Sequence, residues 1–267
     1  MQRLQPENAA KRNDRNFVSS IERAFAVVRS FDASSPELSL SEVAARTGLD
    51  RATARRYLLT LEQLGYVARH DRYFTLRPRI LELGYAYLSS LDLTGIAQPI
   101  LARLVERSGE SSAVTVLDGD EVVYVAVANA ERRLAIRLTV GNRLPAYCTA
   151  MGRVLYSGLD DSELEQILQS HSYAPQTDKT VYQPSELLEI VKHVREQGYA
   201  IVDQEMVLGV RSVAVPLFGK DEHVTAAVSI SSPAARVKIS ELRGSLLEAA
   251  RWAAQEMHAN LVATPMA

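Results

Sequence analysis

The sequence predicts an α+β fold in two parts, and three observations predict it. Residues 17–77 contain closely spaced helical patterns followed by two short β-rich runs. Residues 95–262 alternate helical stretches with strands that pair through tight turns, which is typical of an antiparallel sheet. A helical stretch over 78–94 joins the two parts. A chain of 267 residues is long enough for two separate hydrophobic cores.

Composition places the chain among ordinary globular proteins. Its residues are 47% hydrophobic and 23% charged. No run approaches ~18 uninterrupted apolar residues, so we expect no membrane span and no membrane partner. The N-terminus lacks the apolar core of a signal peptide, and the single cysteine, Cys148, excludes an intrachain disulfide. We therefore expect a cytoplasmic protein.

Charge is unevenly distributed along the chain. Residues 1–77 hold 13 Lys and Arg against nine Asp and Glu, a net charge of +4, which leaves −6 for the remainder of a chain of net charge −2. A basic head on an acidic body favours nucleic acid as the partner of the N-terminal part. Residues 1–16 are polar without periodicity, so we expect a disordered arm there.

The first predicted helix runs from Ser19 to Phe31. Its apolar face is expected to pack against the next helices or against a partner subunit. The residues on that face are Ile21, Phe25, Val28 and Phe31. The segment 32–36 breaks the helix.

Residues 40–64 have the pattern of a helix-turn-helix. A small residue, Ala44, stands four residues before Gly48, where the chain has to turn sharply. Ser39 and Glu42 form a capping box for the first helix, and Asp50 can cap the second. The second helix is expected to bury Ala54, Leu58, Leu61 and Leu64.

The opposite face of the second helix is cationic, with no acid before Glu62. The runs Gly65–Arg69 and Tyr73–Leu76 then predict a β-hairpin, which directly after such a helix indicates a winged helix-turn-helix. We expect this part to bind double-stranded DNA. The predicted contacts are Arg51, Thr53, Arg55, Arg56, Arg69 and Arg72.

Beyond the hairpin the sequence predicts a linker helix and then the larger part. Pro78 suits the first turn of a helix over Pro78–Leu91, and we expect a boundary near 92–95. Further helices are predicted at 96–107, 149–157, 161–169, 186–196 and 239–261. Strands are predicted at 113–117, 121–127, 134–140, 213–218 and 224–230.

Several motifs, in this order and spacing, resemble the IclR family of bacterial transcriptional regulators over Phe17–Leu261. They are F-V-S-S-I-E-R-A-F-A-V-V-R-S-F, the helix-turn-helix, G-N-R-L-P-A-Y-C-T-A-M-G-R-V-L from Gly141, D-Q-E-M-V-L-G-V-R-S-V-A-V-P from Asp203, and S-I-S-S-P from Ser229. The linker text and the run from Asp203 are similar to the branch that controls aromatic-acid breakdown through the protocatechuate and β-ketoadipate route.

This resemblance implies a GAF-like effector domain after the linker helix, and a homodimer or tetramer that binds a small organic acid and a palindromic operator. No cofactor is implied. Carried over by position, the effector residues are Ala150, Met151, Asp203, Ser212, Ser229 and Ser231. Leu144 and Tyr147 are expected to close the site.

Physical chemistry supports such a pocket and leaves two choices open. Ser229 and Ser231 share one strand face, and the helix opening near Thr149 offers unpaired amides with small residues beside them. Asp203 either accepts a proton from a phenolic effector or holds a loop. The basic residues in this part that are candidate counter-charges or structural ion-pair members are Arg137, Arg143 and Arg211.

Motifs for catalysis and metal binding are missing from the sequence. His171, His193 and His223 show no metal-ligand spacing, and no nucleophile elbow, Walker or dinucleotide motif occurs. The leading hypothesis is therefore a regulator that senses a small acid and controls catabolic genes. The alternatives are an enzyme acting on a small acid with a regulatory DNA-binding head, and a DNA-binding scaffold without effector.

Overall fold

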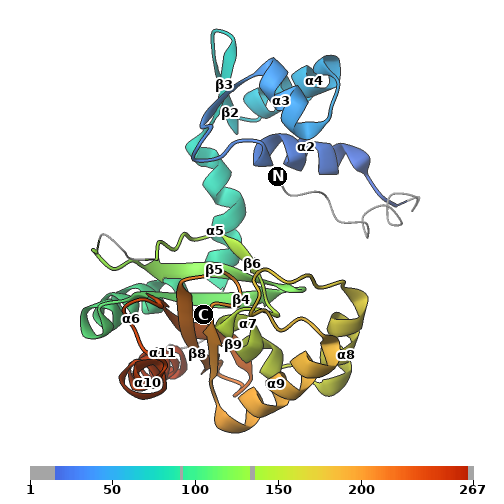
Figure 1. Cartoon of the computed structure of the whole chain (residues 1–267). Coiled ribbons are helices and arrows are strands. Elements are labelled where there is room, and N and C mark those ends of the chain that lie inside the picture. The colour runs from blue at the N-terminus through green and yellow to red at the C-terminus, as the bar shows by residue number, and fades with distance from the viewer. Residues whose placement is uncertain (1–15, 91–92, 133–135, 264–267) are drawn as a thin grey trace. The chain divides into compact units, whose positions relative to one another are not determined.

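The computed structural model describes residues 16–90, 93–132 and 136–263. The chain divides into two compact units, residues 1–87 and 88–267, here called the N-terminal and C-terminal units (Figure 1). The arm predicted for 1–16 lies outside the described residues except for Asn16.

Before the linker, the described part of the N-terminal unit has three helices and a three-stranded antiparallel sheet of order β1-β3-β2. The predicted helix-turn-helix and wing are both present. The elements are α2 (Ser19–Arg29), β1 (Glu37–Ser39), α3 (Leu40–Thr47), α4 (Arg51–Gln63), β2 (Val67–His70) and β3 (Tyr73–Leu76).

Local capping fixes where the two central helices begin. The Glu42 carboxylate accepts a hydrogen bond from the Ser39 amide at 2.7 Å, and the Ser39 hydroxyl accepts one from the Glu42 amide at 3.4 Å. The Asp50 carboxylate accepts from the Thr53 amide at 2.9 Å. Gly48 has φ +69°, the left-handed conformation that ends α3 and turns the chain into α4.

Burial in the N-terminal unit follows the prediction only in part. On the apolar face predicted for the first helix, Phe31 is buried and Val28 packs against the core, whereas Ile21 and Phe25 are 56% and 49% exposed. Packing of these two against a partner subunit stays a prediction. The expected burial of Leu64 is wrong. Leu64 is 52% exposed, because α4 ends at Gln63 and Gly65, with φ +81°, turns the chain toward β2.

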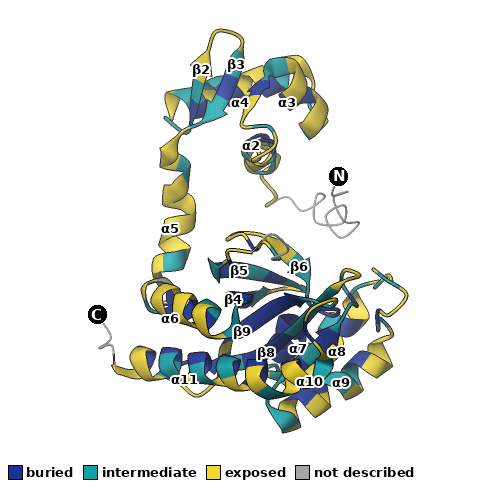
Figure 2. Cartoon of the chain, turned by 60° about the vertical axis from the view of Figure 1, so that its left-hand side comes forward, coloured by how far each residue is buried: buried dark blue, intermediate teal, exposed yellow. Residues whose placement is uncertain are grey.

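The C-terminal unit is a six-stranded antiparallel sheet between two helical layers, as Figure 2 shows. The strand order is β6-β5-β4-β9-β8-β7. The strands are β4 (Ser111–Asp118), β5 (Glu121–Ala128), β6 (Arg143–Pro145), β7 (Ala200–Asp203), β8 (Val210–Phe218) and β9 (Val224–Pro233). The helices are α6 (Leu93–Ser108), α7 (Ala150–Ser157), α8 (Asp161–Ser170), α9 (Pro184–Gln197), α10 (Ile239–Glu241) and α11 (Leu247–Ala263).

Strand alternation gives this sheet two buried faces. Val114 and Val228 point to the face covered by α6 and α11. Ala113 and Ala227 point to the other face, where α7 lies on the sheet and α8 and α9 pack around it. The small alanines on this second face let α7 approach the strands closely.

The strand predicted for 134–140 is wrong for its described residues, 136–140, which carry no strand. The Asn129 side chain takes the place of a neighbouring strand there, because its amide donates to the Leu138 carbonyl at 3.0 Å and its carbonyl accepts from the Leu138 amide at 2.7 Å. The edge of the sheet is formed instead by β6.

Helix boundaries also differ from the prediction in places. The long helix predicted for 239–261 is broken by a π-turn over Leu242–Leu246, where Gly244 has non-helical angles of φ −104° and ψ −109°. The linker helix begins as a 3-10 turn at Pro78–Ile80 and continues as α5 (Leu81–Ser90). Leu91 lies outside the described residues, and α6 begins at Leu93, inside the boundary predicted near 92–95.

Gly152 allows α7 to lie directly against the backbone of Ala146. A Cβ atom at this position would lie 2.1 Å from the Ala146 carbonyl oxygen and 2.3 Å from the Ala146 Cα. The small residues of this segment therefore leave no room for a ligand at Gly152. The space above Gly152 is filled by the chain's own backbone.

Gly152→Ala is expected to destabilise the C-terminal unit by about 3 kcal/mol, because the obstructing atoms are backbone and cannot move aside. The single tryptophan, Trp252, lies in this unit, so urea unfolding followed by its fluorescence reports the loss. Gly95→Ala in α6 is the control, since a Cβ there meets nothing within 4 Å and alanine favours helix. Equal stability of the two variants would contradict the close approach.

Candidate functional site

Helix α4 presents an exposed cationic face. Arg51, Arg55 and Arg56 are exposed, and within the described parts of the chain no carboxylate forms an ion pair with them. Thr53 is half-buried beside them, and its amide is occupied by Asp50. Hydrogen bonds from Thr53 hold the pKa of Asp50 below its usual value. The arginine face is therefore free to meet an external polyanion.

The wing holds its own cations in place. The Arg69 Nε donates to the Asp71 carbonyl at 2.9 Å, and its guanidinium lies 5.9 Å from the Phe74 ring centroid. The Arg72 guanidinium lies 5.0 Å from the Tyr73 ring centroid and donates to the Tyr73 hydroxyl at 3.0 Å. Cation–π contacts of this kind order the side chains without neutralising their charge.

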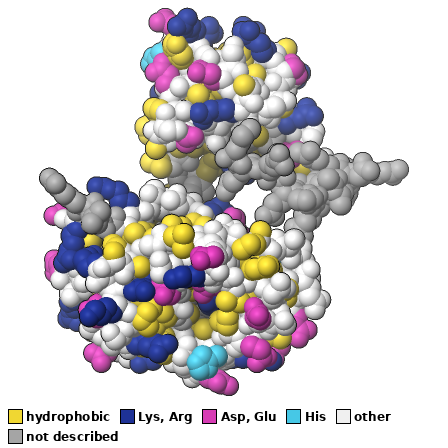
Figure 3. Space-filling view, in the orientation of Figure 1, with side chains coloured by type: hydrophobic (Ala, Val, Ile, Leu, Met, Phe, Trp, Pro, Cys, Tyr) yellow, Lys and Arg dark blue, Asp and Glu magenta, His cyan; other side chains and the backbone are white. Residues whose placement is uncertain are grey.

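A groove of about 270 Å³ between α3, α4 and the wing brings these cations together. Figure 3 shows Lys and Arg side chains gathered at the end of this unit that carries α4 and the wing. The residues lining the groove are Ser39, Leu40, Ser41, Arg51, Arg55, Leu59, Arg69, Arg72 and Phe74. Four guanidinium groups around one groove match the phosphates of a nucleic-acid backbone.

The C-terminal unit contains a cavity of about 180 Å³. It lies beside the first turn of α7 and takes its walls from several strands and two loops. The lining residues are Tyr124, Ile136, Arg137, Leu138, Asn142, Leu144, Cys148, Thr149, Met151, Val202, Met206, Val207, Val210, Ser212 and Ser231. Such a mainly apolar cavity with a few polar groups is typical of small-molecule sites.

Two serines form the polar centre of this cavity. Ser212 on β8 and Ser231 on β9 are paired directly opposite each other in the sheet. Among the described residues no hydrogen bond from either hydroxyl is found, and both serines line the cavity. The Tyr124 phenol is a third polar group, and burial raises its pKa, so it stays neutral. These hydroxyls can bind a polar substituent on a ligand.

Arg137 is the cation of the described lining. Of the three arginines left open by the sequence, Arg143 pairs with Asp118 and Glu121, each at 2.6 Å. Arg211 pairs with Asp203 at 2.6 Å. No described carboxylate pairs with Arg137, which is exposed and can receive a ligand carboxylate.

Four of the eight predicted effector residues line the cavity: Leu144, Met151, Ser212 and Ser231. Four do not. The Tyr147 hydroxyl donates to the Ala174 carbonyl at 2.5 Å, and Ala150 is wholly buried. Asp203 is held by Arg211, which keeps the pKa of its carboxyl low. Ser229 does share the strand face with Ser231, but it is completely buried where α7 packs on β9.

The start of α7 offers fewer free amides than expected. The Thr149 hydroxyl accepts a hydrogen bond from the Gly152 amide at 3.2 Å. Only the amides of Ala150 and Met151 then lack an acceptor within the helix. The helix start is therefore a weaker anion site than the sequence suggested. Arg137 is then the main group of the described lining available to bind a ligand carboxylate.

Sequence reasoning missed Tyr124 and Met206 as lining residues. A signal existed for Tyr124, because it alternates with Val122 and shares the sheet face toward α7. Met206 and Val207 are apolar residues in a loop, and nothing in the local sequence shows that they line a cavity. The local sequence did not distinguish Arg137 from Arg143 and Arg211. The structure does, because those two arginines pair with carboxylates and Arg137 pairs with none that the structure describes.

Neither a metal site nor a membrane span is found in the described residues. No cluster of three or more His, Cys, Asp or Glu there is arranged to hold a metal ion. None of the described helices combines the length and apolarity needed to cross a bilayer.

Two family models match this chain. The IclR helix-turn-helix domain matches residues 20–71, and the C-terminal part of the bacterial transcriptional regulator IclR matches residues 85–259. The chain belongs to the IclR family of bacterial transcriptional regulators. The second match alone covers more than half of the chain. It places the cavity in the C-terminal domain of the family and the arginine groove in its DNA-binding domain.

Similar proteins agree with this assignment. The Pca regulon regulatory protein of Pseudomonas putida is 39% identical over 235 residues, which are 88% of this chain and 81% of that protein. A crystal structure from Rhodococcus sp. RHA1 is 44% identical, covers 92% of this chain and 99% of its own, and has a TM-score of 0.82. An IclR homolog from Microbacterium hydrocarbonoxydans, complexed with 4-hydroxybenzoate, is 23% identical with a TM-score of 0.80, covering 91% and 99%.

These relatives decide between two hypotheses from the sequence. The family consists of named transcriptional regulators, so the chain is a regulator rather than an enzyme. The similarity to Pca regulators also confirms the branch that the sequence motifs resemble.

The Cys148 thiol is expected to react slowly with iodoacetamide at pH 7.5, because burial raises its pKa to about 11 and the thiolate is the nucleophile. The rate should rise as the pH approaches that value, whereas the urea-unfolded chain should already react quickly near pH 8.5. Mass spectrometry of the time course measures both. Equal rates for folded and unfolded chain at pH 7.5 would contradict a buried thiol.

Proposed function

We propose that this regulator binds a small aromatic carboxylic acid in the cavity beside α7 and thereby controls catabolic genes. The observation that carries the proposal is the cavity itself, where the paired hydroxyls of Ser212 and Ser231 and the cation Arg137 border an otherwise largely apolar space. We assign residues 95–262 to this effector domain, 17–77 to the DNA-binding domain and 78–94 to the linker.

The size and chemistry of the cavity favour a ring. An apolar cavity of about 150 Å³ is enough for benzene, and this one measures about 180 Å³. Leu144, Cys148, Met151 and Met206 supply apolar and polarisable surface for a flat ligand. Arg137 would bind the carboxylate, while Ser212 and Ser231 would bind a ring hydroxyl. The 4-hydroxybenzoate of the Microbacterium homolog has this chemistry.

We further propose that two copies of the chain bind a palindromic operator. In the DNA-binding unit, Arg51 and Arg55 would read base edges with Thr53 close by, and Arg56, Arg69 and Arg72 would bind phosphates. Helices α2 and α5 carry large apolar side chains that are exposed, and such surfaces mark protein interfaces. They are Ile21, Phe25, Leu81, Leu83, Tyr85 and Tyr87, with Val18 directly before α2.

Self-association through these surfaces gives a homodimer, or a dimer of dimers, with paired recognition helices on two half-sites. A protein with this task acts in the cytoplasm, where the DNA is.

Arg55→Ala is expected to reduce the free energy of binding to the cognate operator by about 1–3 kcal/mol and to relax sequence preference, because a base contact is lost. Arg72→Ala should weaken specific and random DNA alike and lower the salt dependence, because a phosphate contact is lost. Fluorescence anisotropy at several salt concentrations measures both. Arg243→Ala, an exposed charge in the C-terminal unit, is the control. Equal losses on both DNAs for Arg55→Ala and Arg72→Ala would reject the assignment.

Ser231→Ala is expected to weaken binding of 4-hydroxybenzoate about fivefold but leave benzoate unchanged, because only the first carries a hydroxyl for Ser231. Isothermal titration calorimetry measures the two affinities. Ser229→Ala removes the same atom from the same strand outside the cavity, so it should change neither affinity. The aromatic-acid assignment fails if the wild-type chain binds no aromatic acid, and the effector-free scaffold then takes its place.

A further inference from the structure

Arg153 on α7 does not line the cavity, yet it contacts two segments that do. It is 3% exposed. Its two terminal nitrogens donate to the two oxygens of the Glu205 carboxylate at 2.7 and 2.6 Å. Its Nε donates to the Tyr147 carbonyl at 3.0 Å. One buried guanidinium therefore joins the chain before α7 to the loop after β7.

Glu205 extends this connection to a third segment, the loop between α8 and α9. Its carboxylate also accepts from the Val181 amide at 3.0 Å. Its carbonyl accepts from the hydroxyls of Thr180 and Thr177 at 2.6 and 3.2 Å. The carboxylate and the carbonyl of Glu205 are therefore both held by hydrogen bonds, which restrict the position of residue 205.

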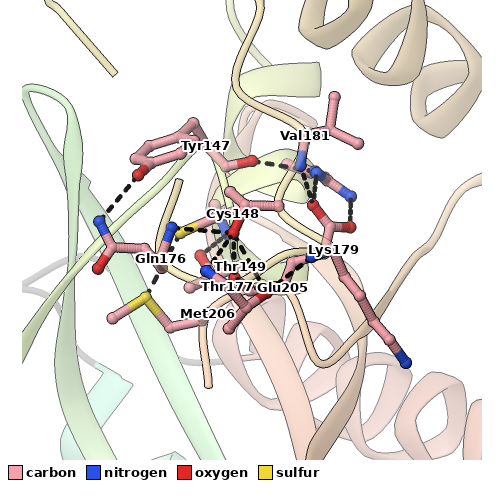
Figure 4. Close-up of polar contacts among 12 residues, drawn as sticks. Tyr147, Cys148, Thr149, Gln176, Thr177, Lys179, Val181, Glu205 and Met206 are labelled. Carbon is pink, nitrogen blue, oxygen red and sulfur yellow. Dashed lines mark hydrogen bonds and ion pairs between the residues drawn. The ribbon is translucent and has the colours of Figure 1, made fainter. Parts of the chain in front are cut away.

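The residues that follow these anchors form the cavity wall. Cys148 follows Tyr147, Met206 follows Glu205, and both line the cavity. Their sulfur atoms are in contact at 3.4 Å. Figure 4 shows the Glu205 and Met206 side chains leaving the backbone in opposite directions, so fixing Glu205 aims Met206. The ion pair and the cavity wall are thus two sides of the same backbone.

We infer that Arg153 and Glu205 are positioning residues that set the affinity and selectivity of the effector cavity without touching the ligand. The inference rests on the proposed function of the cavity. A bidentate pair with a third hydrogen bond to Tyr147 holds Cys148 and Met206 at a fixed separation. A site held this way discriminates ligands by size, and a loosened site does not.

Arg195 offers a matched control in the same helical layer. Its Nε donates to the Ser157 carbonyl at 3.0 Å, and its terminal nitrogens donate to the Leu159 carbonyl and the Asp161 carboxylate, each at 2.9 Å. Like Arg153, this arginine makes three hydrogen bonds to segments at one end of α7, although its side chain is 40% exposed and contacts one carboxylate oxygen. None of its partners lines the cavity.

The test compares Arg153→Lys with Arg195→Lys in the full-length protein. Lysine keeps the charge but loses the fork and the Nε donor. The probes are 4-hydroxybenzoate and 4-hydroxyphenylacetate, which differ by one methylene. Calorimetry gives both dissociation constants, and Trp252 fluorescence gives stability. We expect Arg153→Lys to raise the dissociation constant of the preferred probe about tenfold and to bring the ratio of the two dissociation constants closer to one. Arg195→Lys should lose stability only.

The ratio of the two dissociation constants decides the inference. If this ratio is the same in Arg153→Lys as in the wild type, the inference is overturned, whether the affinity is kept or falls equally for both probes. Where Arg153→Lys does not fold, the double variant Arg153→Met with Glu205→Met removes both charges at similar volume, and the same criterion applies. A wild-type chain that binds neither probe nor any other aromatic acid instead refutes the proposed function, and the inference falls with it.

Discussion

The C-terminal unit is organised around the buried ion pair of Arg153 and Glu205. Burying two charges is costly, and breaking such a pair by removing one partner costs about 3–5 kcal/mol. Here the cost is offset by hydrogen bonds from the guanidinium to Tyr147 and from Val181 to the carboxylate. An apolar pair of similar volume fills the same space but fixes no backbone direction. The charges are therefore best understood as specifying geometry.

That geometry explains why a cavity survives in a closely packed layer. Gly152 lets α7 press against the backbone of Ala146, which closes the space beneath the helix. The ion pair of Arg153 and Glu205 holds Cys148 and Met206 at the edge of the cavity. Tight packing on one side and a fixed loop on the other leave a small gap between them, and the hydroxyls of Ser212 and Ser231 face it.

Two sets of arginines in this chain have opposite roles. In the C-terminal unit Arg143, Arg153, Arg195, Arg211 and Arg236 each face a carboxylate within 3 Å. Their charges are neutralised by ion pairs within the unit. In the groove of the N-terminal unit, Arg51 and Arg55 meet no described carboxylate, and Arg69 and Arg72 rest on aromatic rings. Their positive potential remains available to DNA.

Sequence predicted those features that depend on neighbours in the chain. The capping box at Ser39, the turn at Gly48 and the wing hairpin are local, and the structure has all three. Features that depend on side-chain contacts in the folded chain were missed. Asn129 replaced a strand at Leu138, Arg211 removed Asp203 from the site, and α7 covered Ser229. In each case a contact that the local sequence pattern does not indicate decides the outcome.

The most direct test of the account is a footprint of the full-length protein on the DNA upstream of its own gene, with and without 4-hydroxybenzoate or protocatechuate. The account predicts a protected palindrome whose half-saturation concentration of protein shifts when one of these acids is added. Protection that is absent, or that stays the same with every aromatic acid tried, would contradict a regulator whose cavity senses such an acid.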